Sequence, residues 1–252
     1  MDALKNRVAL VTGSSSGIGA EVARLFAQHG AHVAVHGRNA ETVAHVRDAI
    51  AWEGGTAMGV VADVTRFAEI ERMRCDVERQ LGPIEVLVAN AGGNPSLPRP
   101  VDEMSEDDWR AAVDANLTAT FLTLRSVLPG MKQRRRGTII TISSAAARRP
   151  HAASPVAYAA AKAGIQILTQ DVALQAGPFG VRANCIAPET ILTERNRQRI
   201  PEPQQRTLAE QHPLKRLGTP DDVARAALYL ASDEASWISG VVFDVAGGAV
   251  TV

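Results

Sequence analysis

The chain has 252 residues, and 46% of them are hydrophobic, which is enough for a substantial core. Lys plus Arg and Asp plus Glu both number 27, so no global charge would attract nucleic acid or an anionic membrane, and we expect a small-molecule partner. Cys75 and Cys185 lie far apart without metal-ligand spacing, which predicts reduced thiols and no metal site. Residues 1–7 resemble neither a signal peptide nor a membrane span, so we expect no membrane partner and a cytoplasmic location.

Short apolar runs that favour β-structure alternate with longer amphipathic stretches, which predicts βαβ units and a parallel sheet. The expected strands are Val8–Val11, His32–Val35, Ala57–Val61, Ile84–Ala89, Thr138–Ser143, Val181–Ile186 and Val241–Val245. The expected helices are Ala20–His29, Glu41–Trp52, Arg66–Gln80, a long helix from Ser105, Tyr158–Leu174 and Asp221–Leu230. The predicted fold class is therefore α/β. We expect a single domain over residues 1–252, a Rossmann-type doubly wound parallel sheet with helices on both faces and its ligand at the carboxyl ends of the strands.

Two segments, Ser105–Asp108 and Thr219–Asp222, have the pattern of capped helix starts. The segment Glu189–Gly218 contains three prolines, has the weakest periodicity in the chain and is too long for an ordinary connection. Long segments of this kind are often lids, so we expect residues 189–218 to be a substrate-binding lid.

The first expected strand leads through a Gly/Ser-rich segment, Thr12–Gly19, into a helix. Glycines there permit a tight turn and bring backbone N–H groups close to a pyrophosphate at the helix N-terminus. The spacing is not the common G-x-G-x-x-G, and a Gly/Ser cluster alone is equally consistent with a flexible turn. Its position between a strand and a helix favours phosphate binding.

An ordered set of motifs in this chain resembles the short-chain dehydrogenase/reductase family. The pattern T-G-x-x-x-G-x-G is matched at residues 12–19, Asn-Ala-Gly at Asn90–Gly92 and Tyr-x-x-x-Lys at Tyr158 and Lys162. Ser239–Gly240 and Ala246–Gly248 are also typical, so the likeness covers essentially the whole chain. It implies an NAD(P)-dependent oxidoreductase acting on CH–OH or C=O groups, similar to 3-oxoacyl-[acyl-carrier-protein] reductases. It also implies a homo-oligomer, often a tetramer.

The resemblance also implies which residues hold the cofactor, with Asp63 and Val64 at the adenine and Ile191 and Thr193 at the nicotinamide carboxamide. The full expected set is Gly13, Ser15, Ser16, Gly17, Ile18, Gly19, Arg38, Asp63, Val64, Asn90, Ala91, Gly92, Tyr158, Lys162, Pro188, Ile191 and Thr193.

The choice between NAD(H) and NADP(H) is expected at the end of the second strand, which reads Val35–Asn39. No carboxylate stands there to bind the ribose hydroxyls, whereas Arg38 could stack on adenine and form a fork with a 2′-phosphate. NADP(H) is therefore favoured over NAD(H). The alternatives are that Arg38 is a solvated surface arginine and that Ser16, where NADP-using relatives often carry a second basic residue, weakens the preference.

Tyr158 and Lys162 are four residues apart on an expected helix and so lie on one face. A nearby ammonium favours the phenolate and lowers the pKa of a tyrosine, which would let Tyr158 exchange a proton with the substrate oxygen. Ser144, with Ser143 as an alternative, follows the fifth strand and could hydrogen-bond that oxygen. By resemblance, Lys162 holds the nicotinamide ribose and Asn116 holds a water that links the lysine to solvent.

The remaining charged residues of interest are sorted by their place relative to the expected strands. The family usually has Gly where this chain has Glu189, and we expect that carboxylate to put negative charge near the nicotinamide pocket and to alter substrate choice. Arg134–Arg136 precede a strand and so lie at the opposite edge of the sheet. Arg148 and Arg149 follow Ser144 and could either meet an anionic substrate or be solvated loop charges. We interpret His151 as a loop side chain, and expect residues 94–100 to help shape the pocket.

The sequence therefore predicts an NADP-dependent oxidoreductase that acts on a small-molecule carbonyl or secondary alcohol, with a carrier-bound 3-oxoacyl thioester as the first candidate. A sugar, steroid or polyol dehydrogenase and a catalytically silent NADP-binding regulator are the alternatives. The full set of Asn116, Ser144, Tyr158 and Lys162 argues against a silent protein, because a sensor has no chemical need for it.

Overall fold

A single parallel sheet organises the computed structural model, which describes residues 2–94, 98–150 and 154–250. Its strands are β1 (Val8–Val11), β2 (His32–Gly37), β3 (Thr56–Val61), β4 (Ile84–Ala89), β5 (Gly137–Ile142), β6 (Val181–Pro188) and β7 (Val242–Val245). They are hydrogen-bonded in the order β3-β2-β1-β4-β5-β6-β7, and every neighbouring pair is parallel. The direction of winding reverses between β1 and β4, which is where a doubly wound sheet opens a crevice for a ligand.

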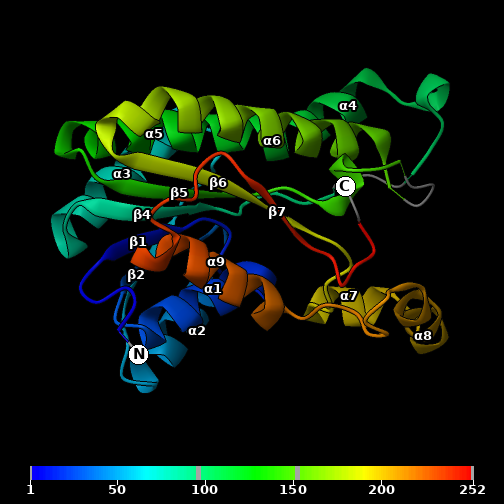
Figure 1. Cartoon of the computed structure of the whole chain (residues 1–252), viewed down its shortest axis with the longest axis horizontal. Helices are drawn as coiled ribbons and strands as arrows, with labels where there is room; N and C mark the ends of the chain where they lie inside the picture. The colour runs from blue at the N-terminus through cyan, green and yellow to red at the C-terminus, as the bar shows by residue number, and fades with distance from the viewer. Residues whose placement is uncertain (1, 95–97, 151–153, 251–252) are drawn as a thin grey trace.

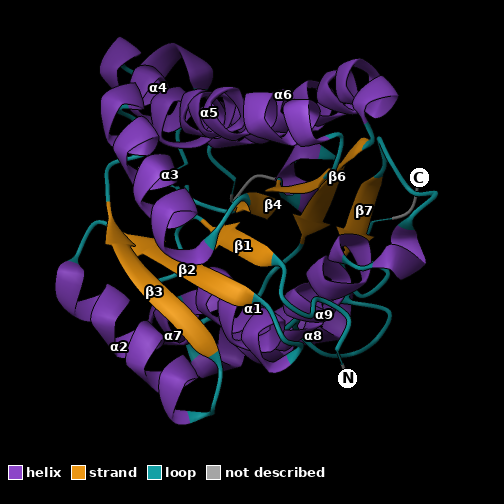
Figure 2. Cartoon of the chain, turned by 90° about the vertical axis from the view of Figure 1, so that its left-hand side faces the viewer, coloured by secondary structure: helices purple, strands orange, loops and turns teal. Residues whose placement is uncertain are grey.

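Helices cover both faces of the sheet (Figure 2). On one face lie α1 (Gly17–Gln28), α2 (Ala40–Trp52) and α9 (Pro220–Ala231), and on the other lie α3 (Phe67–Leu81), α4 (Glu106–Val113), α5 (Ala119–Arg134) and α6 (Val156–Ala176). Two short helices, α7 (Glu194–Arg199) and α8 (Glu202–Gln211), form a lobe beyond the ends of the strands (Figure 1). None of the helices in the described part of the chain is long and apolar enough to span a membrane.

Two cores hold this arrangement, one on each face of the sheet. Ile140 packs with Phe26 and Leu230 on the α1 side, and its neighbour Ile139 packs with Met131 on the α5 side. Successive side chains of a strand point to opposite faces, so a strand buried on both sides reads as a continuous apolar run. Burial of each such side chain contributes roughly 1.5–3 kcal/mol. All six residues of β5 are buried, which fixes the position of whatever follows this strand.

The structure confirms the predicted fold class and differs from the predicted elements in two places. The long helix expected from Ser105 is interrupted by a π-helical turn at Asp114–Thr118 between α4 and α5. The lid segment contains α7 and α8, which hydrophobic periodicity does not reveal because neither helix has a buried residue. His151 and part of the predicted pocket loop at 94–100 lie outside the described residues.

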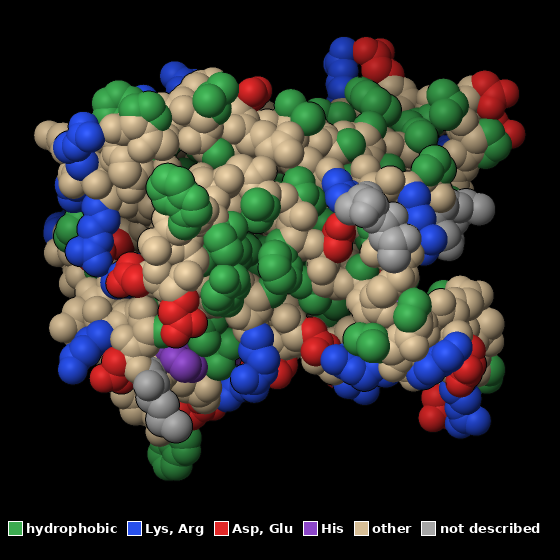
Figure 3. All heavy atoms as spheres, in the orientation of Figure 1, with side chains coloured by type: hydrophobic (Ala, Val, Ile, Leu, Met, Phe, Trp, Pro, Cys, Tyr) green, Lys and Arg blue, Asp and Glu red, His purple; other side chains and the backbone are tan. Residues whose placement is uncertain are grey.

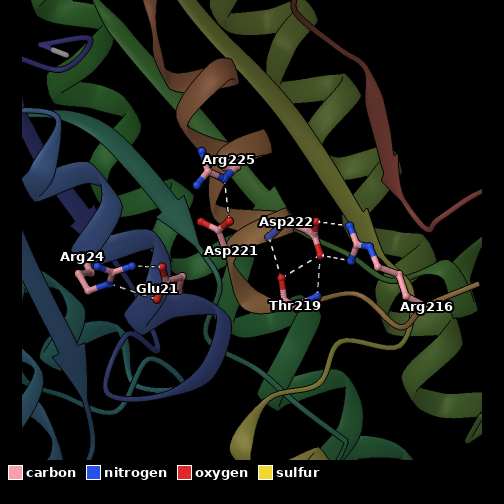
Figure 4. Close-up of polar contacts among 7 residues, drawn as sticks. All are labelled: Glu21, Arg24, Arg216, Thr219, Asp221, Asp222 and Arg225. Carbon is pink, nitrogen blue, oxygen red and sulfur yellow. Dashed lines mark hydrogen bonds and ion pairs between the residues drawn. The ribbon is translucent and has the colours of Figure 1, made fainter. Parts of the chain in front are cut away.

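The expected helix caps are present. Ser105 accepts a hydrogen bond from Asp108 N at α4, and Thr219 and Asp222 form a reciprocal capping box at α9, where Asp222 Oδ2 accepts from Thr219 N at 2.7 Å. Arg216 donates to both carboxylate oxygens of Asp222 at 2.7 Å (Figure 4) and holds the pKa of that carboxyl far below its usual range. These contacts fasten the end of the lid segment to α9.

Removal of the α9 cap tests this anchor. We expect Thr219→Ala to lower the free energy of unfolding by about 1 kcal/mol, because an N–H of the first turn loses its acceptor. Urea titration measures the change. Thr207→Ala, an exposed threonine inside α8, is the control and should change stability by less than about 0.5 kcal/mol. Equal effects of the two substitutions would show that the capping box contributes nothing of its own.

Candidate active site

A cavity of about 640 Å³ lies between the carboxyl edge of the sheet and the α7–α8 lobe. Figure 3 shows the surface hollowed at this place. Three of the four predicted catalytic residues line the cavity: Ser144, Tyr158 and Lys162. Six further residues predicted to bind the cofactor also line it: Ile18, Asn90, Gly92, Pro188, Ile191 and Thr193. The remaining predicted cofactor residues do not line the cavity. Asn116 does not line it either, because its side chain is fully buried.

The Gly-rich loop after β1 is packed against the end of β4. Asn90 Nδ2 donates to Thr12 O and Gly13 O, each at 3.0 Å. A Cβ on Gly13 would lie 2.8 Å from Ala91 Cα, and one on Gly19 would lie 2.6 Å from Asn90 Nδ2 and overlap the Gly13 carbonyl. The predicted roles of these glycines in a tight turn and a close backbone approach therefore agree with the packing.

The start of α1 has the features of an anion-binding helix N-terminus. Its N-cap residue Ser16 makes no side-chain capping bond, and the first turn contains no acidic residue. Gly17 has φ +57°, a conformation that side chains rarely adopt, and opens the helix beside Thr193. Free N–H groups, the helix dipole and the lack of a carboxylate together fit the pyrophosphate of a dinucleotide.

His36 at the end of β2 supports the loop and was not predicted. Its Nδ1 accepts from Gly13 N at 2.9 Å, and its Nε2 donates to Ala62 O at 3.0 Å. Burial lowers the pKa of the ring, which keeps it neutral and leaves one nitrogen as an acceptor. The residues that share these bonds are more than twenty positions apart, so no local sequence pattern could have indicated them.

Arg38 lies one residue beyond β2, exposed, with no hydrogen bond or ion pair to any residue in the described part of the chain. Asp63 lies near enough for Arg38 to contribute to its lowered pKa, although the hydrogen bonds from Thr65 are the larger cause. Val64 is buried beside it. The structure thus brings the residues predicted for the adenosine end of the cofactor together, outside the cavity that holds the predicted catalytic residues.

Ser144 and Tyr158 both line the cavity, and the Ser144 hydroxyl is close enough to Tyr158 to lower its pKa. Lys162 Nζ donates to Ile142 O at 2.8 Å and lies 5.7 Å from the centre of the Tyr158 ring. Burial lowers the pKa of Lys162 to about 8.

The prediction that Lys162 lowers the pKa of Tyr158 is wrong for this structure. Burial raises the pKa of Tyr158, and the hydroxyl of Ser144 offsets only part of that rise. The ammonium lies over the ring face rather than at the hydroxyl, and its bond goes to a backbone carbonyl.

The geometry favours Ser144 over its neighbour Ser143 as the residue that meets the substrate. Ser143 Oγ donates to Lys162 O at 2.8 Å and accepts from Gln166 Nε2 at 3.0 Å, and the side chain is buried. Ser143 therefore connects β5 to α6 and positions the backbone of Lys162.

Asn116 lies in the π-helical turn and is fully buried. Its Nδ2 donates to Gly93 O at 2.8 Å and Ala112 O at 2.9 Å, and its Oδ1 accepts from Gly93 N at 3.0 Å. A Cβ on Gly92 would lie 2.6 Å from Asn116 Oδ1. The side chain holds the segment after β4 in place, and its predicted role as a water ligand stays a prediction.

Glu189 lines the cavity with its carboxylate bonded within the fold, and its predicted effect on substrate choice stays a prediction. Its Oε2 lies 2.7 Å from His212 Nε2 and also accepts from Thr190 N, while His212 Nδ1 lies 2.7 Å from Leu208 O. The pair fastens the end of β6 to the end of α8, and His212 is a site residue that the sequence did not indicate.

The arginines at the amino edge lie where predicted, whereas Arg148 takes neither of the two roles left open for it. Arg134 donates to Ile84 O and Arg136 pairs with Glu85 at 3.0 Å, both at the amino edge of the sheet. Arg148 is paired with Asp244 at 3.2 Å, whereas Arg149 lines the cavity.

Residues 13–250 match the family model described as Enoyl-(Acyl carrier protein) reductase. The chain is 39% identical over 249 residues to 7alpha-hydroxysteroid dehydrogenase of Escherichia coli (strain K12), which covers 98% of this chain and 95% of the relative. The chain belongs to the short-chain dehydrogenase/reductase family. It is accordingly a nicotinamide-dependent oxidoreductase that acts on hydroxyl and carbonyl groups.

Solved structures agree with this assignment. The structure of 7 alpha-hydroxysteroid dehydrogenase complexed with NADH and 7-oxo glycochenodeoxycholic acid has a TM-score of 0.92 at 36% identity and covers 100% of this chain and 97% of that one. A 3-oxoacyl-[acyl-carrier protein] reductase from Brucella melitensis has a TM-score of 0.93 at 33% identity, with 99% and 94% covered. The predicted family and Rossmann-type fold of this oxidoreductase are thus confirmed.

The close approach at Gly19 gives a direct test of the cofactor loop. We expect Gly19→Ala to weaken NADPH binding at least about 10-fold, because the added Cβ must displace the Gly13 carbonyl or Asn90. Fluorescence titration with NADPH measures the effect. Gly177→Ala is the matched control, since a Cβ there meets nothing within 4 Å. Unchanged affinity in Gly19→Ala would contradict the proposed position of the pyrophosphate.

Proposed function

We propose that this protein transfers a hydride between NADP(H) and a ketone or secondary alcohol, with Tyr158 as the group that exchanges the proton. The observation that carries the proposal is that Ser144 and Tyr158 share the wall of the cavity, with the ammonium of the buried Lys162 lying 5.7 Å from the centre of the Tyr158 ring. Bound nicotinamide would supply or accept the hydride. The residues of the loop after β1 and the start of α1 would hold its pyrophosphate.

The chemical roles follow from the two shifted pKa values. Because burial raises the pKa of Tyr158, the phenol keeps its proton at neutral pH and can donate it to a carbonyl oxygen. Ser144 would hydrogen-bond the same oxygen and fix its position between the two hydroxyl groups. Lys162, with a pKa of about 8, carries a charge at neutral pH and would hold the nicotinamide ribose hydroxyls of the bound cofactor.

The preference for NADP(H) rests on this chain's own residues at the end of β2. The solved steroid dehydrogenase is complexed with NADH, so family membership alone does not decide the cofactor. Here Gly37 and Arg38 leave no carboxylate for the ribose hydroxyls, and the exposed guanidinium has no partner among the described residues. A 2′-phosphate supplies the planar, bidentate anion that arginine binds best.

The comparisons support two different substrate classes. Similarity to the Brucella reductase supports a 3-oxoacyl thioester, and identity to the Escherichia coli enzyme supports a steroid. The residues of the lid segment 189–218 that line the cavity, from Glu189 to His212, would close over either compound. The catalytic side chains that line the cavity argue against a silent regulator, because a protein that only binds NADPH needs no proton donor there.

We also place the protein in the cytoplasm as a homo-oligomer, with a tetramer as the family's usual form. Large apolar side chains that a monomer would expose support this: Ile167 and Leu174 on α6, Phe121 on α5 and Trp237 before β7. The two cysteines are free, as expected in a reducing compartment.

Loss of the Tyr158 hydroxyl tests the proposed function. NADPH oxidation, followed by absorbance with a panel of ketones, steroids and 3-oxoacyl thioesters, should fall at least about 100-fold in Tyr158→Phe, because general acid catalysis is lost. NADPH binding by the variant should stay within about threefold of the unmodified chain. Turnover that persists in Tyr158→Phe would contradict the assignment. NADPH binding without turnover of any substrate would favour the silent regulator.

A second substitution tests the cofactor preference. Arg38→Gln should lower kcat/KM for NADPH by about 10- to 100-fold, since a charge-assisted bond contributes roughly 1.5–3 kcal/mol. NADH is the internal control, because it lacks the 2′-phosphate and its kcat/KM should change little. An equal loss of kcat/KM with NADPH and with NADH would show that Arg38 does not bind the 2′-phosphate.

A further inference from the structure

Positive charges outnumber negative ones on the cavity wall, and one positively charged side chain there has no partner among the described residues. Among the described residues that line the cavity, the charged or titratable ones besides Tyr158 are Arg149, Lys162, Glu189 and His212. Glu189 is held by His212, and Lys162 is buried with its ammonium on a backbone carbonyl. Arg149 is exposed and makes no side-chain hydrogen bond or ion pair with any described residue. The wall therefore carries a net positive charge with one guanidinium free to bind a ligand.

Arg149 stands in contrast to the arginine beside it. Arg148 is partly buried and paired with Asp244, so its charge is neutralised within the fold. No carboxylate in the described part of the chain pairs with Arg149. Arg149 follows Ser144 by five residues, with the 3₁₀ turn Ala145–Ala147 between them, so its place relative to the hydroxyl pair is set by the same buried strand, β5.

A second arginine without a partner among the described residues lies near the cavity, although it is not one of the lining residues. Arg195, on α7, has no hydrogen bond or ion pair to the part of the chain that the structure describes. Its Nη1 is 4.0 Å from the position that a Cβ would take on Gly93, which is itself a lining residue. Arg149 on the cavity wall and Arg195 near Gly93 both add positive potential, which would draw an anion toward the hydroxyl pair.

We propose that the substrate is an oxo acid, or the matching hydroxy acid. Arg149 binds its carboxylate, while the ketone or alcohol oxygen lies next to the hydroxyl groups of Ser144 and Tyr158. Guanidinium and carboxylate match as a bidentate pair. Between these two anchors the wall presents polar and apolar surface in equal measure, with Ile200 and Leu208 among the apolar residues on the lid side. The carbon skeleton of the substrate would contact Ile200 and Leu208, with its carboxylate at Arg149. This inference rests on the proposed function and narrows its substrate class.

The test compares each oxo carboxylic acid with its methyl ester over a series of increasing chain length, with NADPH as the reductant. For the unmodified protein we expect kcat/KM for the best acid to exceed that for its ester by about 10- to 100-fold, the range for a charge-assisted hydrogen bond. In Arg149→Gln this acid-to-ester ratio should fall to about 1, and Arg149→Lys should restore part of it. Arg72→Gln, an exposed arginine on α3 away from the cavity, is the control and should keep the full ratio.

The outcomes separate this inference from the proposed function. A ratio near 1 in the unmodified protein, or a high ratio that Arg149→Gln leaves intact, overturns the inference while turnover itself still supports the reductase. If no compound is reduced at all, calorimetric titration of the oxo acids into the protein with NADP⁺ decides. Binding that Arg149→Gln weakens at least about 10-fold supports the carboxylate site, and equal binding by the two proteins overturns it.

Discussion

The close backbone contact between the loop after β1 and the end of β4 is the constraint on which the rest of the site depends. Asn90 bridges the two segments with its side chain, and the glycines at positions 13 and 19 leave no room for a Cβ. This contact occurs where the winding of the sheet reverses, so the start of α1 and the ends of β4 and β5 border the same crevice. His36 adds a third support from β2. Loss of any of these contacts would shift the anion-binding turn relative to the catalytic side chains.

The catalytic end depends on burial more than on charge. The strand β5 is buried on both faces and delivers Ser144 to the edge, while Ser143 bonds back to α6 and sets the position of Lys162. Burial then moves the pKa of Tyr158 upward and that of Lys162 downward. The two pKa values thereby move apart, so that at neutral pH the phenol keeps its proton for donation to a substrate oxygen while the lysine stays charged.

The fold and the outline of the site follow from local patterns. Alternation of strands and helices predicts the sheet, and the Tyr158 to Lys162 spacing predicts a shared helix face. Contacts between distant segments could not be predicted in this way. His212 meets Glu189 across the lid, and nothing in the residues next to either one indicates the pair. The serine alternative at positions 143 and 144 depends on which side chain a strand end turns inward, and the Tyr158 pKa depends on burial, so both needed the structure.

Deuterium transfer tests the central claim most directly. The protein would be incubated with a ketone or oxo acid and NADPH labelled at C4 of the nicotinamide, with each of the two C4 epimers in turn. Mass spectrometry of the product then locates the label. The account predicts that one epimer alone places deuterium on the carbinol carbon and that Tyr158→Phe abolishes the transfer. Absence of deuterium in the product with both epimers, across the substrate panel, would contradict it.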